Sequence, residues 1–283
     1  MSSNEHEKKF SKKIRSFISF ILFLLIVLLS MTVCAKGAFL NKSVIEKQFT
    51  SFEYTSGLRN NVSDYAKDVC KLQGISDGSV DDIFSYKAVS EAVSAYFGYY
   101  ISDKIEYSGE SHIKQINSVC DEFKIKIQNQ LKADGVKYDE AVVDKIADEI
   151  NEYFVNAVEM PHMDKAKSVL NVMDIALYAV IGVSAFFVLS LLLIEFFVGT
   201  KRQRSVRAIA ISFLSAGIYE LFLALIIYII SLVRSVDIFP LYLSKQFLSY
   251  VYMAISSVAF CGGILIFISV IIIAVVWKMR RED

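Results

Sequence analysis

The sequence predicts an all-α membrane protein: four transmembrane helices plus an extracytoplasmic helical bundle between spans 1 and 2. Three observations predict this fold class. The 283-residue chain is 54% hydrophobic with a mean hydropathy of +0.45, yet 21% charged, so apolar and charged residues must be segregated along it. Lysine and arginine concentrate in three short segments. Apolar residues between the first two hydrophobic stretches recur at helical spacing.

Four apolar stretches are long enough to cross a bilayer, because about 20 residues at 1.5 Å each cover the roughly 30 Å hydrocarbon core. The first and last of these apolar runs carry no charge, whereas the second, from Ile175 to Val198, and the third carry one acid each, Glu195 and Glu220. The predicted spans are 17–35, 174–198, 208–233 and 247–277. The first could instead be a cleaved signal peptide, but its apolar run of 19 residues favours a retained anchor.

The basic residues predict the orientation of the chain. Five lysines and arginines lie in the N-terminal segment 1–16, four in the loop 199–207 and three in the C-terminal segment 278–283. Cytoplasmic loops carry such an excess, so all three segments are predicted to be cytoplasmic and the protein to lie in the plasma (cytoplasmic) membrane. Residues 36–173 then form an extracytoplasmic domain, and 234–246 a short external loop.

The predicted external domain is acidic. From Lys36 to Asp174 there are 16 lysines and arginines against 23 aspartates and glutamates, a net charge near −7. This balance argues against nucleic acid or anionic lipid as the external partner. It is compatible with cations or a basic protein, although a solvated acidic face is the commoner meaning.

Apolar stripes at steps of three and four predict four to six helices in this domain. We expect the stripes to form the core of a bundle, and the last helix, through Lys165 and Val169, to continue into the second span. Capping-box spacing predicts helix starts at Ser43 with Glu46 and at Ser79 with Asp82. The stripes run at helical spacing from Leu58 to Leu72, from Val89 to Tyr100, from Ile113 to Leu131 and from Ile146 to Ala157. The aromatic cluster at 96, 97, 99 and 100 could line a ligand groove, but core packing is favoured.

Four cysteines are present, and none is placed like a catalytic nucleophile. Cys34 and Cys261 lie in or beside predicted spans, where small apolar residues are expected. Cys70 and Cys120 are external and could form one disulfide, worth roughly 4 kcal/mol for a loop of about 50 residues. Two buried thiols are an equally acceptable interpretation.

No motif predicts a cofactor, a metal site or an enzyme. The sequence has no P-loop, dinucleotide fingerprint, nucleophile elbow, HExxH or CxxC. Met160, His162 and Met163 combine two thioethers with an imidazole, which suits copper, but a turn before a long helix is favoured. We therefore expect no catalytic residues and no cofactor.

Glu220, deep in the third span, is the candidate that stands above background, because an ionisable group there costs a few kcal/mol unless protonated or paired. Small residues every four positions around it, from Ala208 to Ala224, predict that it faces another helix. Ser256, Ser257 and residues 261–263 of the fourth span are its expected partners. It could be a proton, cation or gating site, but a protonated carboxyl fastening two helices is favoured. Glu195 lies near the cytoplasmic edge, within reach of Lys201 and Arg202.

Three segments carry a family resemblance: FLNKSVIEKQF at 39–49, SGLRNNVSDYAKDV at 56–69 and GISDGSVDDIFSYKAVSEAV at 74–93. In these the chain resembles uncharacterised four-span integral membrane proteins of Gram-positive bacteria that have a helical external domain. By topology alone it is similar to the permease family called FtsX. The short basic loop departs from that family, so the resemblance implies no ATPase partner and no site residues.

Two functional hypotheses follow. The first is a non-enzymatic membrane protein whose external domain binds a partner or senses envelope conditions. The alternative is a small permease or transporter subunit that uses Glu220, which would need a protein partner or self-association through the small-residue faces of the third and fourth spans. A membrane enzyme ranks third, because no nucleophile or metal set can be named.

Overall fold

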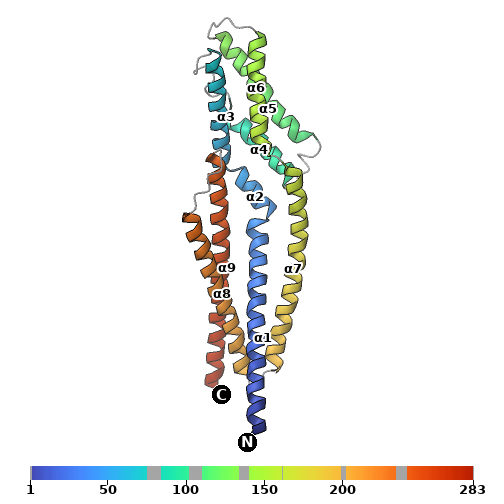
Figure 1. The fold of residues 1–283 in the computed structure, drawn as a ribbon, viewed down its shortest axis with the longest axis vertical. Coiled ribbons are helices and arrows are strands. Elements are labelled where there is room, and N and C mark those ends of the chain that lie inside the picture. Colours follow the sequence, from blue (N-terminus) through green and yellow to red (C-terminus); the bar gives the residue numbers. More distant parts are fainter. Residues whose placement is uncertain are drawn as a thin grey trace. The chain divides into compact units, whose positions relative to one another are not determined.

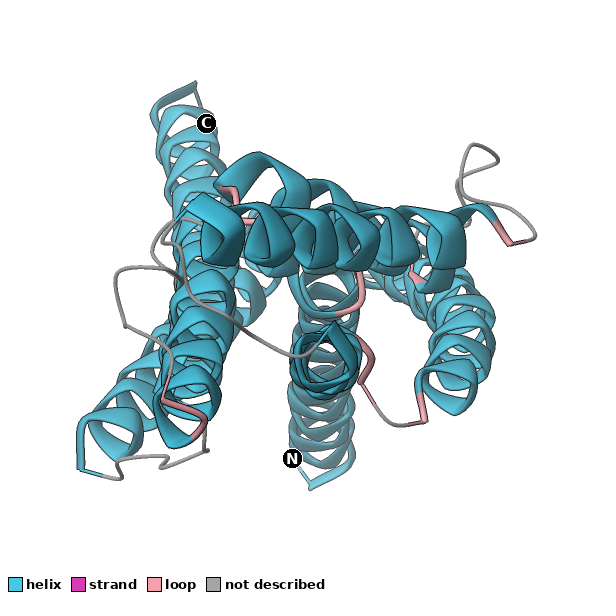
Figure 2. Cartoon of the chain, turned by 90° about the horizontal axis from the view of Figure 1, so that it is seen from above, coloured by secondary structure: helices cyan, strands magenta, loops and turns pink. Residues whose placement is uncertain are grey.

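The computed structural model describes residues 2–74, 84–101, 110–133, 140–160, 162–198, 202–233 and 241–282. These residues form helices joined by loops, with no strand among them, as Figure 2 shows. The predicted all-helical class is therefore confirmed for the part of the chain that the structure describes.

Figure 1 shows the order of the helices. A short π-helical segment, η1, follows the first of them. The bounds are α1 Ser2–Cys34, η1 Ala35–Phe39, α2 Lys42–Phe49, α3 Phe52–Leu72, α4 Tyr86–Tyr100, α5 Ser111–Ala133, α6 Glu140–Val158, α7 Met163–Val198, α8 Arg202–Val233 and α9 Leu241–Glu282.

The chain divides into two compact units. Unit 1 comprises Met1–Leu40, Asn171–Ser235 and Tyr250–Asp283, and unit 2 comprises Asn41–Leu170 and Val236–Ser249. The sequence boundaries at 36 and 173 fall within a few residues of these limits. The end of the predicted loop 234–246 is different, because α9 already begins at Leu241, and residues 234–240 lie outside the described residues.

Four helices, α1, α7, α8 and α9, are long and apolar enough to cross a membrane. They carry large exposed apolar side chains, with Phe186 and Phe267 each 66% exposed and Phe222 60% exposed. Such surfaces are expected where lipid covers a helix. The predicted helix through Lys165 and Val169 is confirmed, because α7 runs without a break from Met163.

In unit 1, α1 packs along α8 (Figure 1). All four long helices contribute to its core, which consists of Leu22, Ile26, Val188, Ala216 and Leu265. A smaller cluster contains Cys34, Ala224 and Val258. Apart from Glu220, the buried positions on α8 are small, which lets the neighbouring helices approach closely.

Unit 2 is a helical bundle with a core of its own, built from α2 to α6. Phe84 is fully enclosed, and its ring stacks on Phe123 of α5 at 4.7 Å and on Phe154 of α6 at 5.6 Å. Side-chain caps start three helices: Asn41 accepts from two backbone N–H groups of α2, Ser51 from one of α3 and Ser85 from one of α4.

The predicted start at Ser43 is wrong by two residues. Asn41 is the cap of α2, and the Ser43 backbone N–H donates to its side-chain oxygen at 3.0 Å. An asparagine oxygen caps a helix as well as a serine hydroxyl does, so the capping-box spacing alone could not choose between them. The other predicted start, Ser79 with Asp82, lies outside the described residues.

The apolar stripes supply most of the buried side chains of unit 2, but residues at the ends of two stripes are exposed. Leu58, Val62 and Val69 of α3 are buried, but Leu72 at the end of the helix is 84% exposed. Ile113 in the first turns of α5 is 43% exposed. Periodicity marks a face correctly, yet it cannot tell where the neighbouring helix stops covering that face.

Candidate functional site

Glu220 is fully buried in unit 1, on α8. The Ser30 hydroxyl of α1 donates to its carboxyl oxygen Oε2 at 3.1 Å, and Oε1 has no hydrogen-bond partner among the described residues. Ser212, Ala216 and Ala224 on the same stripe are buried as well. The expectation that Glu220 faces another helix therefore agrees with the structure.

The partner of Glu220 is different from the one expected. Ser256 and Ser257 of α9 donate to carbonyls of their own helix, Tyr252 and Met253, and not to Glu220. The hydroxyl comes from Ser30 of α1, a helix that the hydropathy pattern had marked only as an anchor. Nothing in the local pattern distinguishes Ser30, because an isolated serine in a span ordinarily bonds to its own backbone.

Two glycines bring α8 and α9 close together beside Glu220. A Cβ atom on Gly217 would lie 2.6 Å from the Gly262 carbonyl oxygen, and one on Gly262 would lie 3.2 Å from the Glu220 Cβ. The expected close-packing role of residues 261–263 is thus met by Gly262, whereas Gly263 has open space around it. This small-residue face is covered within the chain itself.

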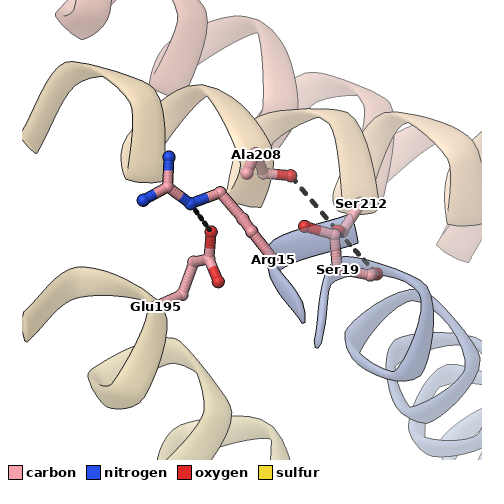
Figure 3. A network of polar contacts seen from close by, with 5 residues as sticks. All are labelled: Arg15, Ser19, Glu195, Ala208 and Ser212. Atoms are coloured by element: carbon pink, nitrogen blue, oxygen red, sulfur yellow. Dashed lines mark hydrogen bonds and ion pairs between the residues drawn. The ribbon is translucent and has the colours of Figure 1, made fainter. Parts of the chain in front are cut away.

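Glu195 of α7 takes part in a polar network at one end of unit 1 (Figure 3). It is 3% exposed, and its Oε1 lies 3.6 Å from Nε of Arg15 on α1. The Ser212 hydroxyl of α8 donates to the Ser19 carbonyl of α1 at 3.1 Å. The sequence assigned Lys201 and Arg202 to Glu195. The structure pairs it with Arg15, and the side chains of Lys201 and Arg202 lie outside the described residues.

Elsewhere in unit 1, the side chain of Lys36 in η1 contacts two residues of α7. Lys36 Nζ lies 2.6 Å from Asp174 Oδ1 and 3.0 Å from the centroid of the Tyr178 ring. Asp174 is the first residue of the predicted second span, and Lys36 directly follows the predicted first span. A charge-assisted hydrogen bond and a cation–π contact thus join η1 to α7.

The cysteines are thiols in the structure, and none is in a disulfide. Cys70 of α3 and Cys120 of α5 are both buried, which agrees with the second of the two interpretations given above. Burial, with a smaller contribution from Asp121, raises the pKa of Cys120 to about 11. In unit 1, Cys34 is buried near Cys261, and its thiol faces the Ser257 carbonyl at 3.7 Å.

Unit 2 contains two adjoining cavities. The first, called here the Tyr54 cavity, has a volume of about 270 Å³. Its lining comes from α3, α6 and the start of α9: Tyr54, Asn61, Tyr153, Asn156, Ala157, Glu159, Met160, Tyr242 and Leu243. The second, the Tyr96 cavity, has a volume of about 490 Å³ and shares three of these residues, Asn156, Glu159 and Met160.

The surroundings of the Tyr54 cavity are held by aromatic contacts and by hydrogen bonds from two side chains. The Tyr54 and Tyr242 rings meet edge to face with centroids 5.5 Å apart. The Tyr153 hydroxyl donates to Asn61 at 2.8 Å, and its ring stacks on Tyr65 at 3.8 Å. The Gln246 amide of α9 donates to the Gln48 carbonyl of α2, which fixes the start of α9 in unit 2.

Tyr54 is the unusual member of this wall. It is 1% exposed, and its hydroxyl has no hydrogen-bond partner among the described residues. Buried tyrosine hydroxyls are ordinarily bonded. Tyr54 continues the stripe of Leu58 and Val62 at a spacing of four, so the sequence could have placed it on the buried face. Tyr242 had no such signal, because it reaches unit 2 from a distant part of the chain.

The Tyr96 cavity is lined by Met160, His162 and Met163, the residues considered above as copper ligands. Tyr100 and Asp164 also line it. His162 has a φ of 67°, in the left-handed region. The Tyr96 hydroxyl donates to the Met160 carbonyl at 3.0 Å. Among the described residues, no three histidine, cysteine, aspartate or glutamate side chains are grouped closely enough to hold a metal ion. Tyr96 and Phe97 are buried, as the core interpretation expected.

Comparisons of the chain with protein-family models, with curated proteins and with solved structures found no match.

Proposed function

We propose that the chain is a non-enzymatic, multi-pass protein of the plasma membrane whose unit 2 lies outside the cytoplasm and binds a partner or senses envelope conditions. The observation that carries this proposal is that unit 2 has a core of its own and two adjoining cavities in its surface. Glu220, by contrast, is enclosed by close helix packing. The four apolar helices then act as the anchor.

The basic segments support the orientation in this proposal. Twelve lysines and arginines occur in the segments 1–16, 199–207 and 278–283. The large apolar side chains exposed on α7, α8 and α9 support insertion into lipid, because water would leave them uncovered.

A labelling experiment tests the location. Lys87 of α4 has an 86% exposed side chain, so a Lys87→Cys variant presents a reactive thiol on unit 2. A membrane-impermeant maleimide should label it in intact cells, whereas an Arg281→Cys variant should react only after permeabilisation. The unsubstituted chain gives the background from the native cysteines. Labelling of Arg281→Cys but not of Lys87→Cys in intact cells would reverse the orientation and refute the proposal.

Crosslinking tests the binding role. Mild crosslinking of whole cells, followed by purification of the full chain, should enrich a specific partner or a self-associated form. The matched control is the same procedure with a crosslinker that reacts only on the cytoplasmic side, which should not capture the same species. A chain recovered only as a monomer without a partner would count against protein binding.

The alternative function is a small permease, and Glu220 Oε1 is the observation that favours it, since a buried carboxyl oxygen without a hydrogen bond could receive a proton or cation. A Glu220→Gln variant keeps the shape and the contact with Ser30. If Glu220 carries ions, flux in reconstituted vesicles should be abolished while thermal unfolding in detergent is unchanged. Equal flux in the variant and the wild-type chain would exclude this role.

A further inference from the structure

Tyr54 lines a cavity, and its buried hydroxyl has an unused hydrogen-bonding capacity among the described residues. Tyr54 is 1% exposed, and burial raises the pKa of its hydroxyl further above its usual value, so the group is protonated at physiological pH. A buried hydroxyl without a partner is destabilising, because it has lost its bonds to water and gained none in return. The nearby hydroxyls of Tyr242 and Tyr96 influence it electrostatically without bonding to it. A bound molecule with a polar group could supply the missing bond.

The composition of the wall indicates the charge of that molecule. Three tyrosine rings, Tyr54, Tyr153 and Tyr242, contribute to one cavity, and aromatic faces attract cations. Glu159 lines both cavities and is exposed at their shared edge. No lysine or arginine is among the described residues that line either cavity. An anion would therefore meet repulsion here, whereas a cation would meet a carboxylate and aromatic faces.

The volume limits the size. Cavities for drug-sized ligands span about 300–1,000 Å³, and the Tyr54 cavity, at about 270 Å³, is slightly smaller. A compact molecule fits it better than a peptide does. The second carboxylate, Asp164, lines only the adjoining Tyr96 cavity, so a single positive charge near Glu159 is the match for the Tyr54 cavity itself.

We propose that the Tyr54 cavity binds a small organic cation, with its ammonium or trimethylammonium group against the tyrosine faces and Glu159 and its polar tail hydrogen-bonded to the Tyr54 hydroxyl. This inference rests on the proposed function, because it makes unit 2 the ligand-binding part of the protein. It adds the chemical class of the ligand and the residues that recognise it.

The test uses the full chain purified in a maltoside detergent, which contains no choline group. Choline is the probe, and 3,3-dimethyl-1-butanol, its uncharged isostere, is the matched control. Isothermal titration should give choline binding that is at least tenfold tighter than binding of the isostere, because only the cation gains from the aromatic faces and the carboxylate. Ethanolamine, a primary amine with the same tail, shows whether the smaller ammonium group is also accepted. Binding of neither amine, or equal binding of choline and its isostere, would overturn the proposal.

Two variants separate recognition from folding. Tyr54→Phe removes only the unpartnered hydroxyl, so the melting temperature without ligand should stay the same or rise, while affinity for the preferred amine should fall about tenfold. Glu159→Gln removes the charge at an exposed position and should weaken binding at least as much. The matched control is Tyr65→Phe on the same helix, whose hydroxyl bonds Glu149 outside both cavities and whose loss should leave affinity unchanged. Wild-type affinity in both Tyr54→Phe and Glu159→Gln would also refute the site.

This result is independent of the test of location. If unit 2 is labelled from outside but neither amine binds, the ligand class is wrong and the proposed location stands. If binding is found and labelling places unit 2 inside, the site stands and the proposed function fails.

Discussion

At the scale of single residues, three serines in unit 1 donate hydrogen bonds from one helix to another. Ser30 donates to Glu220, Ser212 to the Ser19 carbonyl and Ser269 to the Ala210 carbonyl at 2.8 Å. In an apolar environment such bonds specify which helices pair, because an unpaired polar group there is costly. These serines therefore fix the packing partners of α8.

Cys120 gives a prediction about pH. Its raised pKa, about 11 against an ordinary 9.0, means that the folded protein holds it as an unreactive thiol at neutral pH. Maleimide labelling of a chain with alanine at the other three cysteines should increase about tenfold for each pH unit up to about pH 11.

The Cys120 thiol ionises at lower pH in the unfolded chain than in the folded one, so stability is retained below pH 9 and decreases between about pH 9 and 11. A Cys120→Ala variant should lose that part of the pH dependence, and rapid labelling at pH 7 would contradict burial.

Arg15 gives a prediction about stability. Glu195 is 3% exposed, so an Arg15→Gln variant leaves its charge buried without the guanidinium partner. Breaking a buried pair costs roughly 3–5 kcal/mol, and the lower end applies because the Arg15 side chain is about a quarter exposed. Thermal unfolding in detergent measures the loss, with Arg207→Gln, an exposed arginine of α8, as the control. Equal melting temperatures for the two variants would mean that the pair contributes nothing specific.

At the scale of helices, the approach of α8 to α9 is set by Gly217 and Gly262. The obstacle to a larger residue is backbone, not a flexible side-chain end, because a Cβ on Gly217 would meet the Gly262 carbonyl oxygen. The helices can accommodate a methyl group there only by moving apart. Glu220 lies beside this crossing, so its burial depends on the same close approach.

A Gly217→Ala variant should therefore be destabilised by about 1–3 kcal/mol, the usual cost of overpacking. Gly263→Ala is the matched control, because a Cβ there meets nothing within 4 Å and alanine raises helix propensity by up to about 1 kcal/mol. Unfolding of both variants in the same detergent compares them directly. A stabilised Gly217→Ala variant would show that the helices do not approach as closely as described.

The local sequence pattern predicts the helices and the burial of Glu220, but it does not predict which residues of other helices a buried side chain contacts. The helical spacing of Leu58, Val62 and Val69 is a property of one segment, so it could be seen in the sequence. Glu220 pairs with Ser30, and Tyr54 with Tyr242, across 190 and 188 residues of sequence. The period and composition of a segment carry no information on such contacts. The disulfide alternative could not be decided for the same reason.

At the scale of the whole molecule, charge is distributed unevenly while its total is zero. The sequence from Lys36 to Asp174 is acidic, and the segments 1–16, 199–207 and 278–283 are basic. In the proposed orientation the acidic part lies outside and the basic segments lie inside. The excess of lysine and arginine in the basic segments is the signal that sets topology, whereas acidic residues contribute little to it.

The loop 199–207 provides the test at this scale. Replacing Lys201, Arg202, Arg204 and Arg207 with glutamine removes four of the twelve basic residues that point to the cytoplasm. We expect a mixed population in which part of the loop is accessible from outside, read out with a Gln203→Cys substitution at a half-buried position and an impermeant maleimide. The same cysteine in the otherwise unchanged loop is the control. Complete protection in both chains would show that the remaining segments are sufficient.

The stacked tyrosines of unit 2 have an optical consequence. Ten of the 15 tyrosines lie in the segments of unit 2, and Tyr65 and Tyr153 hold their rings 3.8 Å apart and 10° from parallel. The single tryptophan, Trp277, is in α9 within unit 1. Near-ultraviolet circular dichroism of tyrosine, which requires fixed packing, therefore reports mainly on one unit, and tryptophan fluorescence reports on the other. The chain thus contains two separate native spectroscopic probes, so the order in which its two halves melt can be measured without attaching any dye.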